Sequence, residues 1–299
     1  MDRAQKINRL KDLLREDVAE LYRHSNRVWN KPIVETLHQL RETNTRAVIF
    51  GGTLRSLLFS RLFRNQFGRP RDIDLVVSGI TIEHLKSLFE ESVKRETRFG
   101  GLQLERMTWQ FDMWPLEDTW GFKQNRDVSA HFSNLPKTTF FNMEAVAIDV
   151  WTLPGRARSI YSGDDQFFEG LLDRVLEINH EANPFPSLCV IRAFVFASST
   201  GFAIGPRLAA YLRSHSDISD DEIFEIQMKH YGELRLDRDR IRRYLDVVHR
   251  HESSGTDQPV QLPYHGQLAF WPEYEKTAFK IHLLQDSRPM PQANAHTCG

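Results

Sequence analysis

The sequence predicts an α+β protein in which a head with a mixed sheet and flanking helices precedes an all-helical C-terminal half. Short apolar runs bounded by turn residues lie between residues 45 and 160. After residue 161, apolar residues recur every three or four positions instead. We therefore expect N-terminal helices in residues 1–44, a head in 45–160, a helical domain in 161–252 and a partly disordered extension in 253–299.

Two N-terminal helices are expected at residues 5–25 and 33–40, where apolar positions are three or four apart. A short strand at 47–50 ends at a glycine pair, and a helix at 54–63 follows it. After a polar loop at 64–71, a strand is expected at 72–77. A further helix should begin at Thr81, a capping residue, and run to about Lys94.

In the rest of the head, we expect a hairpin formed by residues 102–106 and 109–113. Residues 117–136 should be loop-like with one possible helical stretch, and residues 141–153 should form a strand or a helix-to-strand passage. The apolar period then changes near residues 155–165. Five helices are expected beyond that boundary, at 167–179, 187–198, 207–214, 220–231 and 237–250.

Composition excludes several classes of protein. The 299 residues are 40% hydrophobic and 26% charged, with a formal net charge of −1, so any nucleic-acid contact would have to come from a local basic patch. The two cysteines lie far apart in the sequence, which argues against a disulfide framework. The N-terminus is too charged for a signal peptide, and no apolar run approaches the roughly 20 residues that span a bilayer. We expect a cytoplasmic protein with no membrane partner.

Asp72 and Asp74 are the first candidate site residues. Side chains two positions apart on a strand project from the same face. An isolated pair of this kind is more often a solvated strand face, but here the apolar run of residues 75–77 indicates that the strand enters a core. Two carboxylates there repel each other, and magnesium prefers oxygen ligands of this type.

The second candidate is the turn at Gly51 and Gly52, between the strand and the next helix. Glycine lets the backbone approach a ligand closely, and a helix N-terminus attracts an anion such as a phosphate. Thr53 would add a hydroxyl and Arg55 a positive charge. A tight turn with no ligand is the common alternative for a glycine pair.

A two-metal site usually needs a third carboxylate. Asp112 is the first choice, because an acid between Phe111 and Met113 in a strand is costly unless it is paired or metal-bound. Asp149 has the same character and is the second choice. A buried aspartate satisfied by backbone amides or an arginine stays open as the alternative. The sequence has no zinc-binding, P-loop or serine-hydrolase motif.

Four segments together resemble the nucleotidyltransferase superfamily, and most of all the head and neck of tRNA CCA-adding enzymes and bacterial poly(A) polymerases. In order, they are GGTLRSLL followed by RDIDLVV at 51–77, RFGGL through Phe111-Asp112 at 98–112, FFNMEA at 140–145, and IRAFVFA followed by Gly201-Phe202 at 191–202. The resemblance covers about residues 45–215.

The resemblance implies a magnesium-dependent nucleotidyltransferase with an NTP as substrate. The three aspartates Asp72, Asp74 and Asp112 would hold two Mg²⁺ ions. The nucleotide would be bound by Gly51, Gly52, Thr53, Arg55, Lys137, Asn142 and Arg192.

The sequence also departs from the family. The loop before Asp72 is longer than usual, Ser56 stands where an Asp is common, and Lys137-Thr138 replaces an Arg-Asp pair. The neck positions that read the incoming base in the family with an Asp and an Arg are Pro186 and Cys189, which cannot form those hydrogen bonds. Catalysis is therefore compatible with the residues, whereas CCA addition is not.

Three functions stay open from sequence. The first is nucleotidyl transfer to an acceptor hydroxyl, which would belong to an RNA 3′ end such as that of tRNA, to a protein or to a small molecule. Arginines of the helical half would favour RNA, but they alternate with acids and are typical of a solvated face. The second is a catalytically retired nucleotidyltransferase fold that acts as a nucleotide- or partner-binding regulator. The third is a purely structural role, which the ordered series of motifs disfavours.

Overall fold

A seven-stranded mixed sheet forms the centre of the head in the computed structural model, which describes residues 1–23, 30–63, 70, 72–97, 99–124, 127–152, 154–253 and 257–263. The strand order is β3-β4-β5-β2-β1-β6-β7. The strands are β1 (Arg46–Phe50), β2 (Asp72–Ser78), β3 (Val93–Glu96), β4 (Leu102–Arg106), β5 (Trp109–Pro115), β6 (Ala147–Asp149) and β7 (Ile160–Tyr161). The expected α+β class is confirmed, and the hairpin is β4–β5.

One strand pair decides what the sheet brings together. β2 pairs with β5 in parallel, with Asp74 opposite Asp112, while every other pair in this sheet is antiparallel. Residues directly opposite each other in neighbouring strands project from the same face. The parallel pair therefore places polar residues of two distant segments side by side.

The two faces of the sheet differ in their cover. The first face carries Ile73, Leu75 and Phe111, which belong to the main core together with apolar residues of the first three helices. These helices are α1 (Arg3–Arg23), α2 (Lys31–Glu42) and α3 (Gly52–Leu62). The opposite face carries Val48 and Val76, which pack in a smaller cluster against residues 116–135. That smaller cover leaves room for a cavity.

Short elements complete the head. They are α4 (Ile82–Leu88), α5 (Trp120–Gln124) and the 3-10 turns η1 (Glu90–Ser92), η2 (Leu116–Asp118), η3 (Leu135–Thr138) and η4 (Asn142–Glu144). Thr81 caps α4 as expected, because its hydroxyl accepts a hydrogen bond from the amide of His84. The helix does not continue to Lys94, however. It ends at Leu88, and the chain turns into β3, which pairs with β4.

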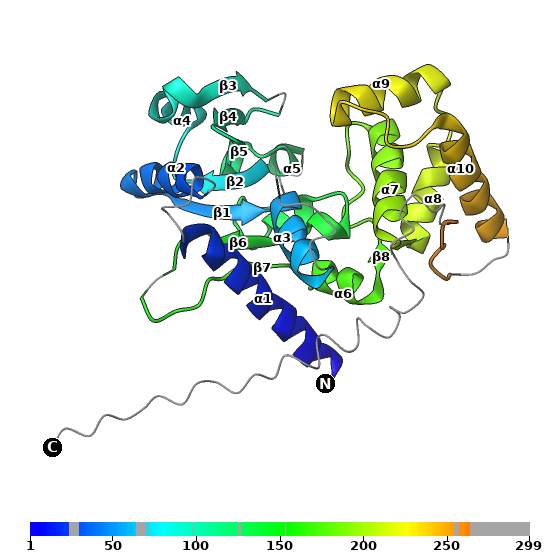
Figure 1. Cartoon of the computed structure of the whole chain (residues 1–299), viewed down its shortest axis with the longest axis horizontal. Helices are drawn as coiled ribbons and strands as arrows, with labels where there is room; N and C mark the ends of the chain where they lie inside the picture. The colour runs from blue at the N-terminus through cyan, green and yellow to red at the C-terminus, as the bar shows by residue number, and fades with distance from the viewer. Residues whose placement is uncertain are drawn as a thin grey trace.

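The C-terminal half stands beside the head as a group of helices (Figure 1). These are α7 (Pro186–Thr200), α8 (Pro206–Ser214), α9 (Asp220–Tyr231) and α10 (Arg238–Ser253). α6 (Gln166–Asp173) precedes them in the chain and packs against η4 and α1 of the head. The core of the C-terminal half is continuous with that of the head, because the ring of Phe59 in α3 lies 6.0 Å from that of Phe196 and 5.7 Å from that of Phe202.

Two expectations for this half are corrected. The helix expected to reach Asn179 ends at Asp173, because Arg174 adopts a left-handed conformation. β8 (Val175–Leu176) follows and pairs in parallel with β9 (Ala203–Ile204), so this half is not purely helical. Both strands have only two residues and carry no periodic signal of their own.

Part of the expected pattern falls outside the described residues. This holds for most of the loop at 64–71, for Arg98 and for residues 264–299 of the expected extension. Among the helices that are described, none combines the length and apolar character that a membrane crossing requires.

Candidate functional site

Three aspartates share one face of the sheet. Asp74 lies opposite Asp112 in the parallel β2–β5 pair, and Asp72 lies two residues before Asp74 on the same side of β2. Ile73, which lies between the two aspartates of β2, and Phe111, which precedes Asp112 on β5, are fully buried on the other face. Alternation along two strands thus brings together the three carboxylates that the sequence picked out separately.

Asp74 has the most perturbed environment of the three. Burial, and after it the neighbouring charges of Asp112, Asp72 and Glu144, raise its pKa to about 8, although Arg55 acts to lower it. Three carboxylates at one place are unfavourable unless a cation joins them. This arrangement fits a hard divalent cation such as Mg²⁺, which binds carboxylate oxygens.

Asp112 is held by two amide side chains. The Gln103 Nε2 donates a hydrogen bond of 2.9 Å to Asp112 Oδ1, and Gln110 Nε2 donates one of 3.4 Å to Oδ2. Among the described residues, no group of three or more His, Cys, Asp or Glu side chains is arranged to hold a metal ion. Each carboxylate oxygen has two lone pairs, so these amide bonds leave acceptor capacity for a cation.

The glycine turn lies directly beside Asp74. Gly51 has φ 62° and ψ −121°, a combination that side chains rarely adopt, and α3 begins at the next residue. A Cβ atom at Gly52 would lie 3.6 Å from both Asp74 Oδ2 and Arg55 Nη2. The first amides of a helix have no partner within the helix and carry a partial positive charge. An anion next to the acidic group would meet them.

Thr53 has a different task from the one expected. Its buried hydroxyl donates to the Asp72 carbonyl at 3.2 Å and accepts from the Asp74 amide at 3.1 Å. Both bonds tie the first turn of α3 to the backbone of β2. Thr53 therefore positions the two aspartates and does not offer its hydroxyl proton to a phosphate.

Arg55 and Arg192 converge on a residue that the sequence reading missed, Glu144. Arg55 Nη1 lies 3.5 Å from Glu144 Oε1, and Arg192 Nη2 forms an ion pair with the same oxygen. The three side chains are 24%, 26% and 17% exposed and come from α3, α7 and η4. Two guanidinium groups share one carboxylate, which leaves one positive charge in excess. Burial lowers the pKa of Arg55. A further anion beside it would stabilise the charged form of the guanidinium group.

A cavity of about 480 Å³ lies beside these groups, and Asp112 is not part of its lining. Gly51, Gly52, Asp72, Asp74, Arg55, Glu144 and Arg192 line its charged part, and Phe99, Trp114 and Trp120 line an aromatic part. The aromatic residues were not expected from sequence. A neighbouring glycine is linked to one of them, because a Cβ atom at Gly101 would overlap Trp114. Gly121, directly after Trp120, allows α5 to lie against Thr138, since a Cβ atom there would overlap that threonine.

Two residues expected to bind nucleotide lie elsewhere. Asn142 is buried, its Nδ2 donates to the Val175 carbonyl at 3.0 Å, and its Oδ1 accepts from the Glu177 amide at 3.0 Å. It fixes η4 against the helical half. Lys137 does not line the cavity with the aspartates but an adjoining hollow of about 200 Å³, which shares Trp120, Gly121 and Thr138 with it.

The positions that would read a base carry no suitable groups, as the sequence indicates. Pro186 is the first residue of α7. Cys189 is 1% exposed, and burial raises the pKa of its thiol to about 12. The second choice for a third carboxylate, Asp149, lies on β6, where it accepts a hydrogen bond of 3.1 Å from the Tyr161 hydroxyl. Arg46 Nη2 is 4.0 Å from it.

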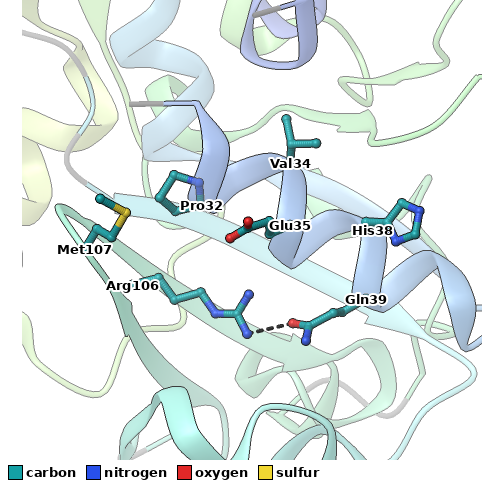
Figure 2. A pocket seen from close by; sticks show the side chains of 7 residues that line it. All are labelled: Pro32, Val34, Glu35, His38, Gln39, Arg106 and Met107. Carbon is teal, nitrogen blue, oxygen red and sulfur yellow. Dashed lines mark hydrogen bonds between the residues drawn. The ribbon is translucent and has the colours of Figure 1, made fainter. Parts of the chain in front are cut away.

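A second hollow has a different character. It measures about 630 Å³ and lies between α2 and the β4–β5 turn (Figure 2). Arg106 projects into it but is already bonded, to Gln39 Oε1 at 2.6 Å, Thr36 Oγ1 at 3.3 Å and Ser92 Oγ at 3.0 Å. Burial lowers the pKa of Arg106, as it lowers that of Arg55. Size alone therefore does not identify the site, because the described lining of this larger hollow contains one carboxylate, Glu35, and no group of acids.

Comparisons with solved structures find related folds. The chain is similar to a CCA-adding enzyme in complex with CTP, at 16% identity and a TM-score of 0.50, over 75% of this chain and 51% of that one. A CCA-adding enzyme with ATP is 18% identical, with a TM-score of 0.48 over 70% and 49%. The Thermotoga maritima CCA-adding enzyme complexed with tRNA is 18% identical, with a TM-score of 0.46 over 66% and 47%.

This chain spans about half the length of these solved structures. No protein-family model and no curated protein matches the sequence. At such low identity the likeness informs about the fold and not about the reaction. The sheet topology, the helical half and the similarity to the CCA-adding enzyme with CTP together indicate that the chain has a nucleotidyltransferase-like fold.

Proposed function

We propose that the protein is a magnesium-dependent nucleotidyltransferase that moves a nucleoside monophosphate from an NTP to an acceptor hydroxyl. One observation carries the proposal. Asp74, a partly buried carboxylate, shares a sheet face with two further carboxylates beside a glycine turn and a helix N-terminus, and Arg55 and Arg192 line the same cavity. The acids suit metal ions, and the turn with its arginines suits a polyphosphate.

Asp72 and Asp74 would hold the metal ions together with Asp112, which is adjacent to Asp74 in the sheet. When bound, Mg²⁺ would neutralise phosphate charge and favour the ionised form of an attacking hydroxyl. Gln103 and Gln110 keep Asp112 in place through their amide bonds. Thr53 performs the same positioning for the backbone of β2.

The triphosphate would lie between the start of α3 and the two arginines. Gly51 and Gly52 allow it to approach backbone amides, since no side chain intervenes. Arg55 and Arg192 supply charge, with Glu144 holding both guanidinium groups in orientation. In the transfer, a bond forms between the acceptor oxygen and the α-phosphorus, and the bond to pyrophosphate breaks. Such a reaction depends mainly on alignment and charge neutralisation.

The acceptor is proposed to be a hydroxyl of an RNA, a protein or a small molecule, without CCA addition. Pro186 and Cys189 provide no hydrogen-bonding pair that could select cytosine and then adenine. Several arginines of α10 and its neighbourhood are paired with acids, among them Arg235 with Glu233 and Arg242 with Asp220. These pairs weaken the case for a continuous RNA-binding track on this surface.

The test is pyrophosphate release by the full chain with Mg²⁺ and each of the four NTPs, with and without bulk tRNA. We expect release with at least one NTP, and a loss of at least about two to three orders of magnitude in Asp74→Asn. Asp149→Asn is the matched control, because this carboxylate lies on the same sheet but outside the cavity.

Two outcomes would contradict the proposal. If NTPs raise the melting temperature but no pyrophosphate is released with any acceptor, the chain is a nucleotide-binding regulator. If Asp74→Asn and Asp149→Asn retain equal activity, the reaction does not use the carboxylates of β2.

A further inference from the structure

The aromatic part of the cavity lies next to its acidic part. Trp114 is opposite Val76 in the β2–β5 pair, two residues beyond the pair formed by Asp74 and Asp112. At 3.2–3.4 Å per residue this places the start of the aromatic part about 7 Å along the strands from the acids. A bound molecule with a charged end and a planar end would span both parts.

Three aromatic side chains from separate elements form this aromatic wall, which we define as Phe99, Trp114 and Trp120. All three are partly exposed and line the cavity. The ring of Phe99 lies 6.2 Å from that of Trp120 and 6.0 Å from that of Phe185, which directly precedes α7. The aromatic wall therefore closes the gap between the head and the first turn of α7.

Glycines allow close packing around the aromatic wall. Gly121 lets α5 lie against Thr138, since any side chain there would overlap that threonine. Gly101 does the same for the indole of Trp114. A Cβ at Gly100 would lie 3.6 Å from Lys123 Nζ, so the turn that carries Phe99 also lies close to α5. Rings that are already ordered lose little entropy when a planar group stacks on them.

Three threonines stand among the described residues that line the cavity together with the aromatic wall. Thr119, Thr138 and Thr139 line the cavity, but each hydroxyl donates to a backbone carbonyl, those of Leu116 at 2.9 Å, Leu135 at 2.7 Å and Pro136 at 3.1 Å. Their protons are therefore used within the fold. Stacking tolerates any base because every base has a π-face, whereas discrimination needs hydrogen bonds to the base edge.

We propose that the base of the bound nucleotide stacks on Trp120 and Phe99, and that this aromatic wall binds all four bases with affinities that follow their stacking surface. Purine nucleotides then bind more tightly than pyrimidine nucleotides, without strict selection of one base. This inference rests on the proposed function, in which the charged part of the same cavity holds the triphosphate.

The experiment measures equilibrium binding of ATP, GTP, CTP, UTP and inorganic tripolyphosphate to the full chain with Mg²⁺. We expect Trp120→Ala to weaken ATP binding roughly 5- to 150-fold and to leave tripolyphosphate binding unchanged. Trp120→Phe should restore most of the affinity. Trp151→Ala is the matched control, a partly buried tryptophan that packs on the main core outside the cavity lining. Phe99→Ala provides a second variant with the same expected direction if Trp120→Ala lowers the melting temperature below the assay range.

The outcomes separate the inference from the function on which it rests. If tripolyphosphate binds and the four NTPs bind no more tightly than it does, the aromatic wall does not hold a base, although the charged part still binds phosphate. Equal loss of ATP and tripolyphosphate in Trp120→Ala would also overturn the inference. A wild-type preference above about 100-fold for one base would contradict base-tolerant stacking. If tripolyphosphate itself does not bind, the proposed function fails first.

Discussion

The hollow around Arg106 and the cavity around Asp74 differ in how their charged groups are satisfied. Around Arg106, each guanidinium contact ends on a neutral oxygen of Gln39, Thr36 or Ser92, and the ring of Phe89 lies 5.3 Å below. Around Asp74, acids face acids, and two arginines share one carboxylate. The first arrangement stabilises the fold by itself, whereas the second is complete only with ligands. Unsatisfied charge, rather than volume, distinguishes the site.

The largest difference between the two hollows should appear when one arginine is removed from each. We expect Arg192→Ala to weaken tripolyphosphate binding about 10- to 100-fold, because a charge-assisted contact contributes about 1.5–3 kcal/mol. Arg106→Ala should leave that affinity unchanged and lower the free energy of unfolding by about 1–3 kcal/mol through lost buried hydrogen bonds. Binding titrations and denaturant unfolding of both variants provide the measurement.

The comparison breaks if the two variants behave alike. Equal weakening of tripolyphosphate binding by Arg106→Ala would show that the hollow beside α2 also binds anions. An unchanged affinity in Arg192→Ala would show that the excess charge of the Arg55–Glu144–Arg192 cluster plays no part in holding phosphate.

A smaller effect is expected from pH in the metal-free protein. The pKa of Asp74 is raised to about 8 in the folded chain, whereas an unfolded aspartate titrates near 3.9. Between these values the folded state binds the additional proton, so stability falls as pH rises, by at most about 1.4 kcal/mol per pH unit. Below pH 4 both states are protonated, and above pH 8 both are ionised, so this contribution to the slope vanishes.

Melting temperatures of the chelated protein from pH 5 to pH 8 test this expectation against Asp74→Asn, which lacks the titrating group. The wild-type temperature should fall more steeply with pH than that of the variant, and Mg²⁺ should reduce the difference at the alkaline end. Parallel curves in the two proteins would show that Asp74 is not surrounded by unneutralised carboxylates.

The sequence predicts the acids of β2 well and their partners only in part. The shared face of Asp72 and Asp74 could be predicted from the alternation of side chains along one strand. The apolar run at residues 75–77 indicates that this strand enters the core. That Asp112 stands opposite Asp74 depends on a parallel pairing between segments about 40 residues apart, which no local pattern specifies. The apolar neighbours of Asp112 made it the first choice over Asp149, and the resemblance to a known family implies the same position.

The misassigned residues share one physical reason. Thr53 and Asn142 have side chains suited to a ligand, but the fold uses both for bonds to backbone groups of other elements. Glu144 escaped attention because its role depends on two arginines from distant helices. The short strands β3, β7, β8 and β9 were missed likewise, since two to four residues carry too little periodicity and tertiary pairing decides their conformation.

The account rests on the carboxylates of β2 and β5 binding metal ions beside the glycine turn. A crystal structure of the full chain with Mn²⁺ and a non-hydrolysable NTP tests this most directly through the anomalous signal of the metal. We predict Mn²⁺ within coordination distance of Asp72 and Asp74, with Asp112 contributing an oxygen and the triphosphate against Gly51 and Gly52. Nucleotide bound in the cavity with no Mn²⁺ at these aspartates, or Mn²⁺ bound only elsewhere, would contradict the account.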